Sequence, residues 1–256
     1  MPRLTSIGSS PAGLFAAREP LFSHGDLSLR ILLPRSADEL IDEEAFNRDE
    51  RLPYWADLWP SAKALARWLI DEHPPHSNGE KPLRIIEVGC GATALASLVL
   101  AIRGFETLAT DYEPEALQLA EYNARRNGVA DPEAMPQSGI RGETGRLRTR
   151  LMDWRNVPDD LAQGENGDAG FDLVLGADLM YEQRNAIALA DCVSEIIARA
   201  GRMILADPGR RYLSEFQTRM KQRGFTERER AVITEANDDP TRPATPVRII
   251  EFKRPG

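Results

Sequence analysis

Acidic side chains lie in or directly after four short apolar runs of this sequence, and a glycine turn follows the first run. The acids are Glu87, Asp111, Asp153 and Asp178, and the turn is Gly89-Cys90-Gly91. Glycines let the backbone turn sharply and approach a ligand closely, and carboxylates accept hydrogen bonds from hydroxyl and amino groups. One acid at a strand end is often only a helix cap. Four of them in register with a glycine turn predict a ligand site.

The chemistry of these residues matches S-adenosylmethionine. Asp111 can accept hydrogen bonds from both vicinal ribose hydroxyls of this molecule, and Asp153 from the amino group of its adenine. Trp154 or Tyr112 could stack on the adenine, and the alternative for Tyr112 is a ring that lies on the sheet edge. Glu87 and the overall acidity are compatible with the positive ammonium and sulfonium groups.

A dinucleotide is the alternative ligand for the same turn. The spacing Gly89-x-Gly91-x-x-Ala94 also satisfies the dinucleotide fingerprint, and Asp111 lies 22 residues beyond Gly89, close to where a ribose-binding acid is expected. S-adenosylmethionine has no phosphate, so it needs no third glycine and tolerates Ala94. An NAD-dependent oxidoreductase therefore stays as an alternative to a methyltransferase.

The segment 176–181 is the best candidate for catalysis, because it ends the run nearest the reactive end of such a cofactor. Ala177 would lie beside the cofactor, and Asp178 and Tyr181 could both face the pocket. A carboxylate can hold a lysine ammonium, and the face of a tyrosine ring can stabilise it by cation–π attraction. The alternative for Asp178 is a cap of the following helix.

Two tryptophans and a tyrosine lie between Pro53 and Pro60. Pro60 suits the first turn of a helix. Trp55 and Trp59 could be a hydrophobic staple at the entry to that helix, or an aromatic lid over the cofactor, and the two interpretations are compatible.

Alternating strand and helix patterns position these residues. The predicted strands are 83–88, 107–111, 147–152, 171–178 and 203–206, each with a helix after it except the third, and then 229–234 and 247–252 with only a turn between them. This pattern predicts an α/β fold, a doubly wound, mainly parallel seven-stranded sheet with a C-terminal antiparallel hairpin at one edge. One helix is expected to carry its apolar face as far as Ala200.

The start of the chain is predicted as an N-terminal extension, residues 1–80, packed on a methyltransferase domain of residues 81–256. Residues 1 to about 25 are rich in Ser, Pro, Gly and Ala, which predicts a loosely attached segment. A strand is expected from Leu27 to Leu33 and a helix around 37–46. Residues 130–146 are predicted to be a surface insertion.

Composition excludes several classes of function. The net charge of −8 argues against nucleic-acid binding. No apolar run is long enough for a membrane span, and no signal peptide is evident, so we expect a cytoplasmic protein. Two cysteines and three histidines are too few for a disulfide framework or a zinc site, and no metal is expected.

The motifs together resemble the seven-β-strand protein-lysine methyltransferases of methyltransferase family 16. They are Pro53-Tyr54-Trp55-Ala56 with Trp59-Pro60, Glu87-Val88-Gly89-Cys90-Gly91, Asp153-Trp154, Asp178-x-x-Tyr181 and Asp207-Pro208-Gly209-Arg210. The resemblance covers residues 27 to 254 and implies S-adenosylmethionine as cofactor. It implies cofactor contacts for Trp59, Glu87, Gly89, Asp111 and Trp154, and contacts to the target lysine for Asp178 and Tyr181.

The resemblance also implies a protein substrate, with the β subunit of the electron-transfer flavoprotein as a suggested example. Two alternatives stay open beside it: N-methylation of a small-molecule amine in the same pocket, and a cofactor-binding partner protein without catalysis. The sequence does not indicate the oligomeric state.

Overall fold

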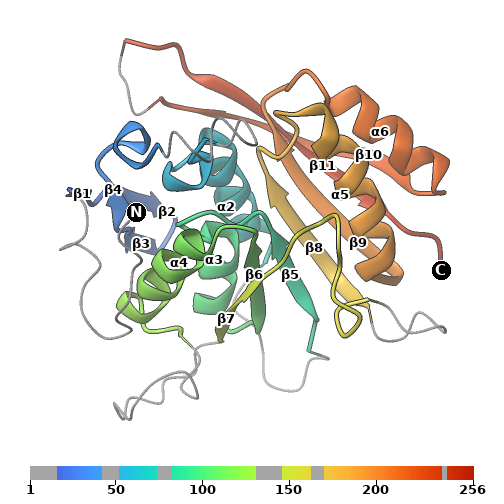
Figure 1. The fold of residues 1–256 in the computed structure, drawn as a ribbon, viewed down its shortest axis with the longest axis horizontal. Coiled ribbons are helices and arrows are strands. Elements are labelled where there is room, and N and C mark those ends of the chain that lie inside the picture. The colour runs from blue at the N-terminus through green and yellow to red at the C-terminus, as the bar shows by residue number, and fades with distance from the viewer. Residues whose placement is uncertain (1–15, 42–51, 74–81, 131–145, 163–169, 238–240) are drawn as a thin grey trace.

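The computed structural model describes residues 16–41, 52–73, 82–130, 146–162, 170–237 and 241–256, and a seven-stranded sheet runs through its middle (Figure 1). The strand order is β10-β11-β9-β8-β5-β6-β7. The strands are β5 (Ile85–Val88), β6 (Thr107–Asp111), β7 (Leu147–Leu151), β8 (Phe171–Ala177), β9 (Ile197–Asp207), β10 (Thr226–Glu235) and β11 (Thr245–Lys253).

The sheet is parallel except at its C-terminal edge. β5 pairs in parallel with both β6 and β8, β6 with β7, and β8 with β9. β11 is antiparallel to β9 and to β10, which forms the edge. From β5 the chain adds β6 and β7 on one side, and it then returns to add β8 and β9 on the other side of β5. The sheet is therefore doubly wound. The predicted fold class is confirmed, hairpin included.

Helices cover both faces of this sheet (Figure 1). α2 (Pro60–Glu72), α3 (Leu95–Ile102) and α4 (Pro114–Arg126) lie on one face, and α5 (Gln183–Ile196) and α6 (Leu213–Gln222) on the other. Successive side chains of β8 point to opposite faces, so Leu175 belongs to the first hydrophobic cluster and Val174 to the second. A strand that is buried on both sides needs such a continuous apolar run.

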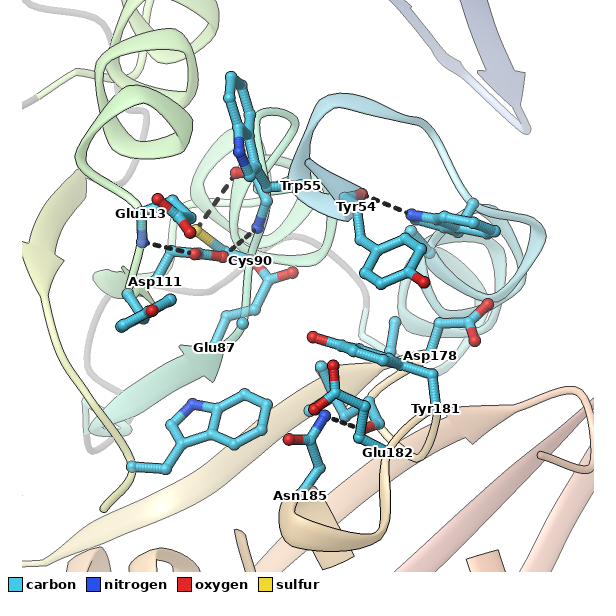
Figure 2. A pocket seen from close by; sticks show the side chains of 18 of the residues that line it. Tyr54, Trp55, Glu87, Cys90, Asp111, Glu113, Asp178, Tyr181, Glu182 and Asn185 are labelled. Atoms are coloured by element: carbon cyan, nitrogen blue, oxygen red, sulfur yellow. Dashed lines mark hydrogen bonds between the residues drawn. The ribbon is translucent and has the colours of Figure 1, made fainter. Parts of the chain in front are cut away.

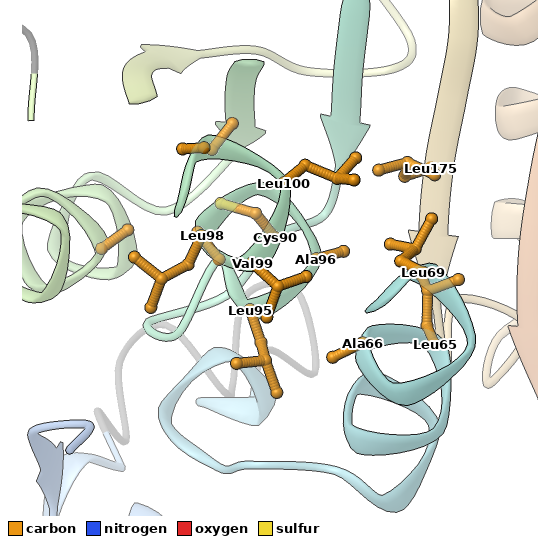
Figure 3. Packing of buried hydrophobic residues seen from close by; sticks show 14 of the residues in the cluster. Leu65, Ala66, Leu69, Cys90, Leu95, Ala96, Leu98, Val99, Leu100 and Leu175 are labelled. Carbon is orange, nitrogen blue, oxygen red and sulfur yellow. The ribbon is translucent and has the colours of Figure 1, made fainter. Parts of the chain in front are cut away.

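Helix α2 comes from the segment predicted to be an N-terminal extension packed on the core, and it lies directly on the sheet. Its Leu65 and Leu69 are fully buried and face Val99 of α3 and Leu175 of β8 (Figure 3). The first residue of α2 is Pro60, as predicted, and Trp59 is its N-cap. The N-terminus of α2 therefore lies beside the carboxyl ends of the central strands.

The prediction of a loosely attached segment up to about residue 25 is wrong for residues 16–25, the part of it that the structure describes. β1 (Ala17–Arg18) pairs with β4 (Leu33–Pro34), and β2 (Leu21–His24) pairs with β3 (Leu27–Arg30). Strand pairing, local in the hairpin of β2 and β3 and more distant between β1 and β4, overrides a composition that is typical of loops. The expected single strand from Leu27 to Leu33 is thus two short strands, and of the expected helix around 37–46 the structure describes one 3₁₀ turn, η2 (Ala37–Leu40).

A second correction concerns residues 197–200, which were expected to continue the helix before them. α5 ends at Ile196, and Ile197 already pairs with Phe171 of β8. The end of the chain explains this, because Ala200 donates its N–H to Pro255 O at 3.3 Å.

Some predictions lie outside the described residues. They concern residues 1–15, most of the 130–146 insertion and the second half of the helix expected around 37–46. No helix in the described part of the chain is long and apolar enough to cross a membrane, and the same part holds no cluster of His, Cys, Asp or Glu suited to a metal ion.

Candidate active site

A cavity of about 390 Å³ opens at the carboxyl ends of the central strands (Figure 2). Every residue that the sequence assigned to a site lines it: Trp59, Glu87, Gly89, Gly91, Asp111, Tyr112, Asp153, Trp154, Ala177, Asp178 and Tyr181. Carboxyl ends of strands at a topological switch are where open α/β sheets bind ligands. The structure therefore brings the whole predicted set together, while the role of each residue remains a prediction.

The glycine turn after β5 needs both of its glycines. Gly89 and Gly91 have φ angles of 64° and 59°, a region that L side chains rarely occupy. A Cβ on Gly89 would lie 2.7 Å from Leu179 Cδ2 and 3.0 Å from Trp154 Cζ2, and one on Gly91 would lie 3.1 Å from Trp55 O. The turn thus brings the backbone close to the aromatic and aliphatic lining of the cavity.

Asp111 at the end of β6 fastens this turn. Its Oδ2 accepts the Gly91 N–H at 2.8 Å and its Oδ1 accepts the Glu113 N–H at 3.0 Å (Figure 2). Burial raises the pKa of Asp111 to about 6, although both of these hydrogen bonds work in the opposite direction. Each carboxylate oxygen has a further lone pair, so Asp111 can still accept bonds from a ligand in the cavity.

The side chain of Glu87, a residue of strand β5, reaches the N-terminus of helix α3. The N-cap, Ala94, has a left-handed conformation and offers no side-chain oxygen, and Glu87 Oε2 accepts the N–H of Ser97 at 2.7 Å instead. Burial raises the pKa of Glu87 to about 7, and the bonds from Ser97 and Ala96 oppose the shift. An acidic side chain, about half ionised at pH 7, therefore occupies the helix end where a pyrophosphate would bind in a dinucleotide site.

The aromatic segment before α2 closes another side of the cavity. Tyr54, Trp55 and Ala56 form the 3₁₀ turn η3 (Tyr54–Ala56), and Trp55 O accepts the N–H of Ala92 from the glycine turn at 2.8 Å. Trp59 Nε1 donates to Tyr54 O at 2.8 Å. The segment is thus both the entry to α2 and a wall of the cavity, so both interpretations of the tryptophans agree with the structure.

The residues predicted to hold adenine have a partner that the sequence did not indicate. Asp153 forms a two-pronged ion pair with Arg155, at 2.9 and 2.8 Å. The guanidinium of Arg155 also lies over the Tyr112 ring, 5.6 Å from its centroid. Trp154, half-buried, lines the cavity beside them.

Asp178 and Tyr181 lie at the opposite end, in the loop between β8 and α5. Asp178 is buried and accepts hydrogen bonds from Arg210 Nε at 2.5 Å and from Ser61 Oγ at 3.1 Å. It is not the cap of α5, whose N-cap is Glu182. Burial of its hydroxyl raises the pKa of Tyr181 to about 12, so this phenol is neutral at physiological pH.

Sequence reasoning missed four residues of this end: Tyr54, Ser61, Asn185 and Arg210. Tyr54 packs against Tyr181 with ring centroids 5.0 Å apart, and both rings edge the cavity (Figure 2). Asn185 donates to Leu179 O at 3.0 Å, which holds the loop to the first turn of α5. Tyr54 and Arg210 both belong to sequence motifs described above, so a signal for them was present. Ser61 carried none, because only folding brings α2 to this loop.

Acidic residues outnumber basic residues in the lining of the cavity. Arg155 and Arg184 are its only cationic lining residues within the described chain. The same lining contains seven acidic residues, namely Asp57, Glu87, Asp111, Glu113, Asp153, Asp178 and Glu182. Such a surface attracts positive ligands and disfavours phosphates.

Comparison with solved structures defines the class of fold. The protein YcgJ of Bacillus subtilis superposes with a TM-score of 0.53 at 12% identity over 75% of this chain and 99% of that one. Magnesium protoporphyrin IX methyltransferase from Synechocystis, solved with bound S-adenosylmethionine, gives 0.50 at 15% over 84% and 86%. This chain therefore has the Rossmann-like fold of S-adenosylmethionine-dependent methyltransferases.

Comparison of sequences then gives the family. Residues 46–223 match the model of a lysine methyltransferase family, and the chain belongs to that family. The electron transfer flavoprotein β subunit lysine methyltransferase of Rattus norvegicus is 30% identical over 72% of this chain and 61% of its own length. A protein N-terminal and lysine N-methyltransferase of Eremothecium gossypii is 32% identical over 64% and 59%. The chain thus spans about three fifths of these relatives.

Proposed function

We propose that this protein is an S-adenosylmethionine-dependent N-methyltransferase that acts on lysine side chains of a protein. The observation that carries the proposal is Glu87, a buried carboxylate bonded to the first turn of α3. In a dinucleotide site this helix end receives a pyrophosphate, and a carboxylate there repels it. A cationic cofactor without phosphate is the ligand that suits the same geometry.

The residues of the cavity fit this cofactor. At Gly89 and Gly91 any side chain would collide with Leu179, Trp154 or the Trp55 carbonyl, so only glycine lets the backbone line the cavity there. Asp111 offers acceptors for a ribose, Trp154 and Tyr112 offer aromatic faces for an adenine, and Glu87 offers negative charge for the ammonium and sulfonium groups. When bound, S-adenosylmethionine supplies an activated methyl group, and the protein has to align the acceptor and exclude water.

The acceptor end suits an amine. Tyr54 and Tyr181 place two aromatic faces beside the carboxylate of Asp178, and such faces attract a cation. For transfer, the lone pair of the acceptor nitrogen forms the bond to the methyl carbon as the carbon–sulfur bond breaks, and the electron pair of that bond stays on sulfur. The nitrogen must first lose a proton, which passes to water at the mouth of the cavity.

Family membership and the activities for which the relatives are named support a protein lysine as acceptor, and the electron-transfer flavoprotein β subunit is the first substrate to test. Tyr54 and Tyr181 are 38% and 39% exposed, so a side chain that projects from a protein surface could reach them. A small amine would reach the same pocket, which keeps that activity as the second candidate.

Incubation with S-adenosylmethionine labelled in its methyl group tests the proposal. The purified β subunit and a whole-cell lysate serve as acceptors, in parallel. We expect label in a protein band. Label only in the small-molecule fraction would favour the small amine, and binding without label would favour a partner protein that lacks catalysis. A melting temperature raised by NAD and unaffected by S-adenosylmethionine would overturn the cofactor assignment.

A further inference from the structure

Each oxygen of the Asp178 carboxylate already accepts one hydrogen bond from the protein before any acceptor arrives, and each keeps a further lone pair. Oδ1 accepts from Arg210 Nε and Oδ2 from Ser61 Oγ, and the Asp178 side chain is only 5% exposed. Its backbone has a φ of 59°, a strained value for a residue with a side chain, and its N–H donates to Ala206 O at 2.9 Å. Asp178 is therefore held rigidly, and its charge is already balanced by a cation.

The structure also holds Arg210 in a defined place. Asp207 Oδ1 accepts the N–H groups of Gly209 and Arg210, each at 2.7 Å, which folds the turn after β9 back towards β8. The guanidinium lies over the Trp59 ring, 5.5 Å from its centroid. Burial works against the charge of Arg210, but its bond to Asp178 and the attraction of Asp178 and Asp207 raise the pKa of Arg210.

Arg210 is not among the residues that line the cavity. It reaches Asp178 from outside the cavity lining, so we place it out of contact with the acceptor and the cofactor. Among the described residues, the titratable groups around this end of the cavity include Tyr54, Tyr181, Glu182 and Asp207, and Arg184 of α5 also lines the cavity. Arg210 is the cation that bonds to Asp178.

This pairing matters because methyl transfer needs a neutral amine. A lone carboxylate in a site of low dielectric would hold a lysine as its ammonium form, which binds well but has no lone pair for attack. We propose that Arg210 is a positioning residue that cancels the charge of Asp178, so that Asp178 orients the acceptor amine through a hydrogen bond without trapping its proton. This inference rests on the proposed function and adds a residue to it.

The variants Arg210→Met and Arg210→Lys, with Arg211→Met as a control, test the inference. Arg211 is the exposed neighbour and its guanidinium lies over Tyr212, away from the cavity. Single-turnover methyl transfer is measured against pH, with the electron-transfer flavoprotein β subunit as acceptor or, if that is not labelled, the lysate protein that is. For Arg210→Met we expect the acidic limb of the profile to move up by about one pH unit, which is about tenfold in rate at a fixed pH on that limb.

Other readouts separate this electrostatic role from a structural one. Arg210→Met should leave the KM for the acceptor unchanged or lower, and the Kd of S-adenosylmethionine within about threefold of the wild type. Arg210→Lys and Arg211→Met should keep the wild-type profile. The double variant Arg210→Met/Asp178→Asn, which again has no net charge at this position, should recover the wild-type pH dependence although its maximal rate is lower.

The outcomes are distinguishable. If the wild type labels no amine, the proposed function fails and this inference falls with it. If the wild type is active and folded Arg210→Met has an unshifted profile, the inference alone is wrong. The inference would also be overturned if the acidic limb of the double variant stayed at the position found for Arg210→Met. A purely structural role of Arg210 predicts that result, because removing a second side chain cannot restore a lost structural support.

Discussion

At the scale of single residues, the site works through buried carboxylates whose partners differ. Asp111 bonds to two backbone N–H groups, Glu87 to the end of a helix and Asp178 to an arginine. The sequence predicted that these acids share a pocket, because each ends or follows a strand. It could not predict their partners, since Ser61 and Arg210 reach Asp178 only through the packing of distant elements.

Replacing Asp111→Ala should weaken the binding of S-adenosylmethionine. The lost acceptor for the ribose hydroxyls corresponds to about 1.5–3 kcal/mol, or roughly tenfold to a hundredfold in Kd. Isothermal titration calorimetry measures this on protein shown to be folded by its melting curve. Asp160→Ala, which removes a surface partner of Arg150, is the matched control and should bind normally. Wild-type affinity in folded Asp111→Ala would refute the ribose role.

Tyr181 belongs to the acceptor end, so its replacement should spare the cofactor. Tyr181→Phe keeps an aromatic face for the incoming cation and should lower catalytic efficiency only mildly, by less than about fivefold for a pair of this strength. Tyr181→Ala removes the face and its contact with Tyr54 and should be clearly worse. Initial rates with the labelled protein acceptor give both values. Equal losses in the two variants would contradict the cation–π role.

At the scale of elements, the strands and helices that carry the site were predictable and the irregular pieces were not. The buried apolar runs of β5, β6 and β8 and the glycine and proline signals around α3 and α4 are local. Residues 197–200 and the strand β1 owe their structure to pairing with more distant segments of the chain, which no local pattern records. β2 and β3 form a tight local hairpin that the composition of this segment did not reveal.

Helix α3 begins on a titratable group, so its stability should depend on pH. Burial raises the pKa of Glu87 to about 7 and that of Asp111 to about 6, against about 4 in an unfolded chain. Between these limits the folded state binds more protons than the unfolded state. The free energy of unfolding should therefore fall as pH rises from about 4 to 7 and then level off. At about 1.4 kcal/mol per unit of pKa shift, the two groups together give a fall on the order of 6 kcal/mol.

Urea denaturation from pH 5 to pH 8 without cofactor measures this dependence. Glu87→Gln keeps an oxygen for the Ser97 N–H but cannot ionise, so the fall of stability over this range should be smaller. Glu106→Gln changes an exposed glutamate and should behave like the wild type. A pH dependence that is the same in Glu87→Gln and in the wild type would mean that Glu87 titrates alike in both states.

At the scale of the whole molecule, a doubly wound sheet brings strand ends that are far apart in sequence together at one acidic cavity. The N-terminus of α2 forms a further wall of this cavity. The chain belongs to a lysine methyltransferase family, and this class of acceptor is the centre of our account. The division at residue 80 and the cytoplasmic location stay predictions. The relatives include a protein named for both N-terminal and lysine methylation, so the nitrogen that receives the methyl group has to be identified.

Identification of the methylated amino acid tests the central claim most directly. The protein labelled from S-adenosylmethionine is hydrolysed to free amino acids, and the label is separated by chromatography against methylated standards. Our account predicts that the label runs with Nε-methylated lysine. Label on an α-amino group, on arginine or on histidine, or label that never enters protein, would contradict it.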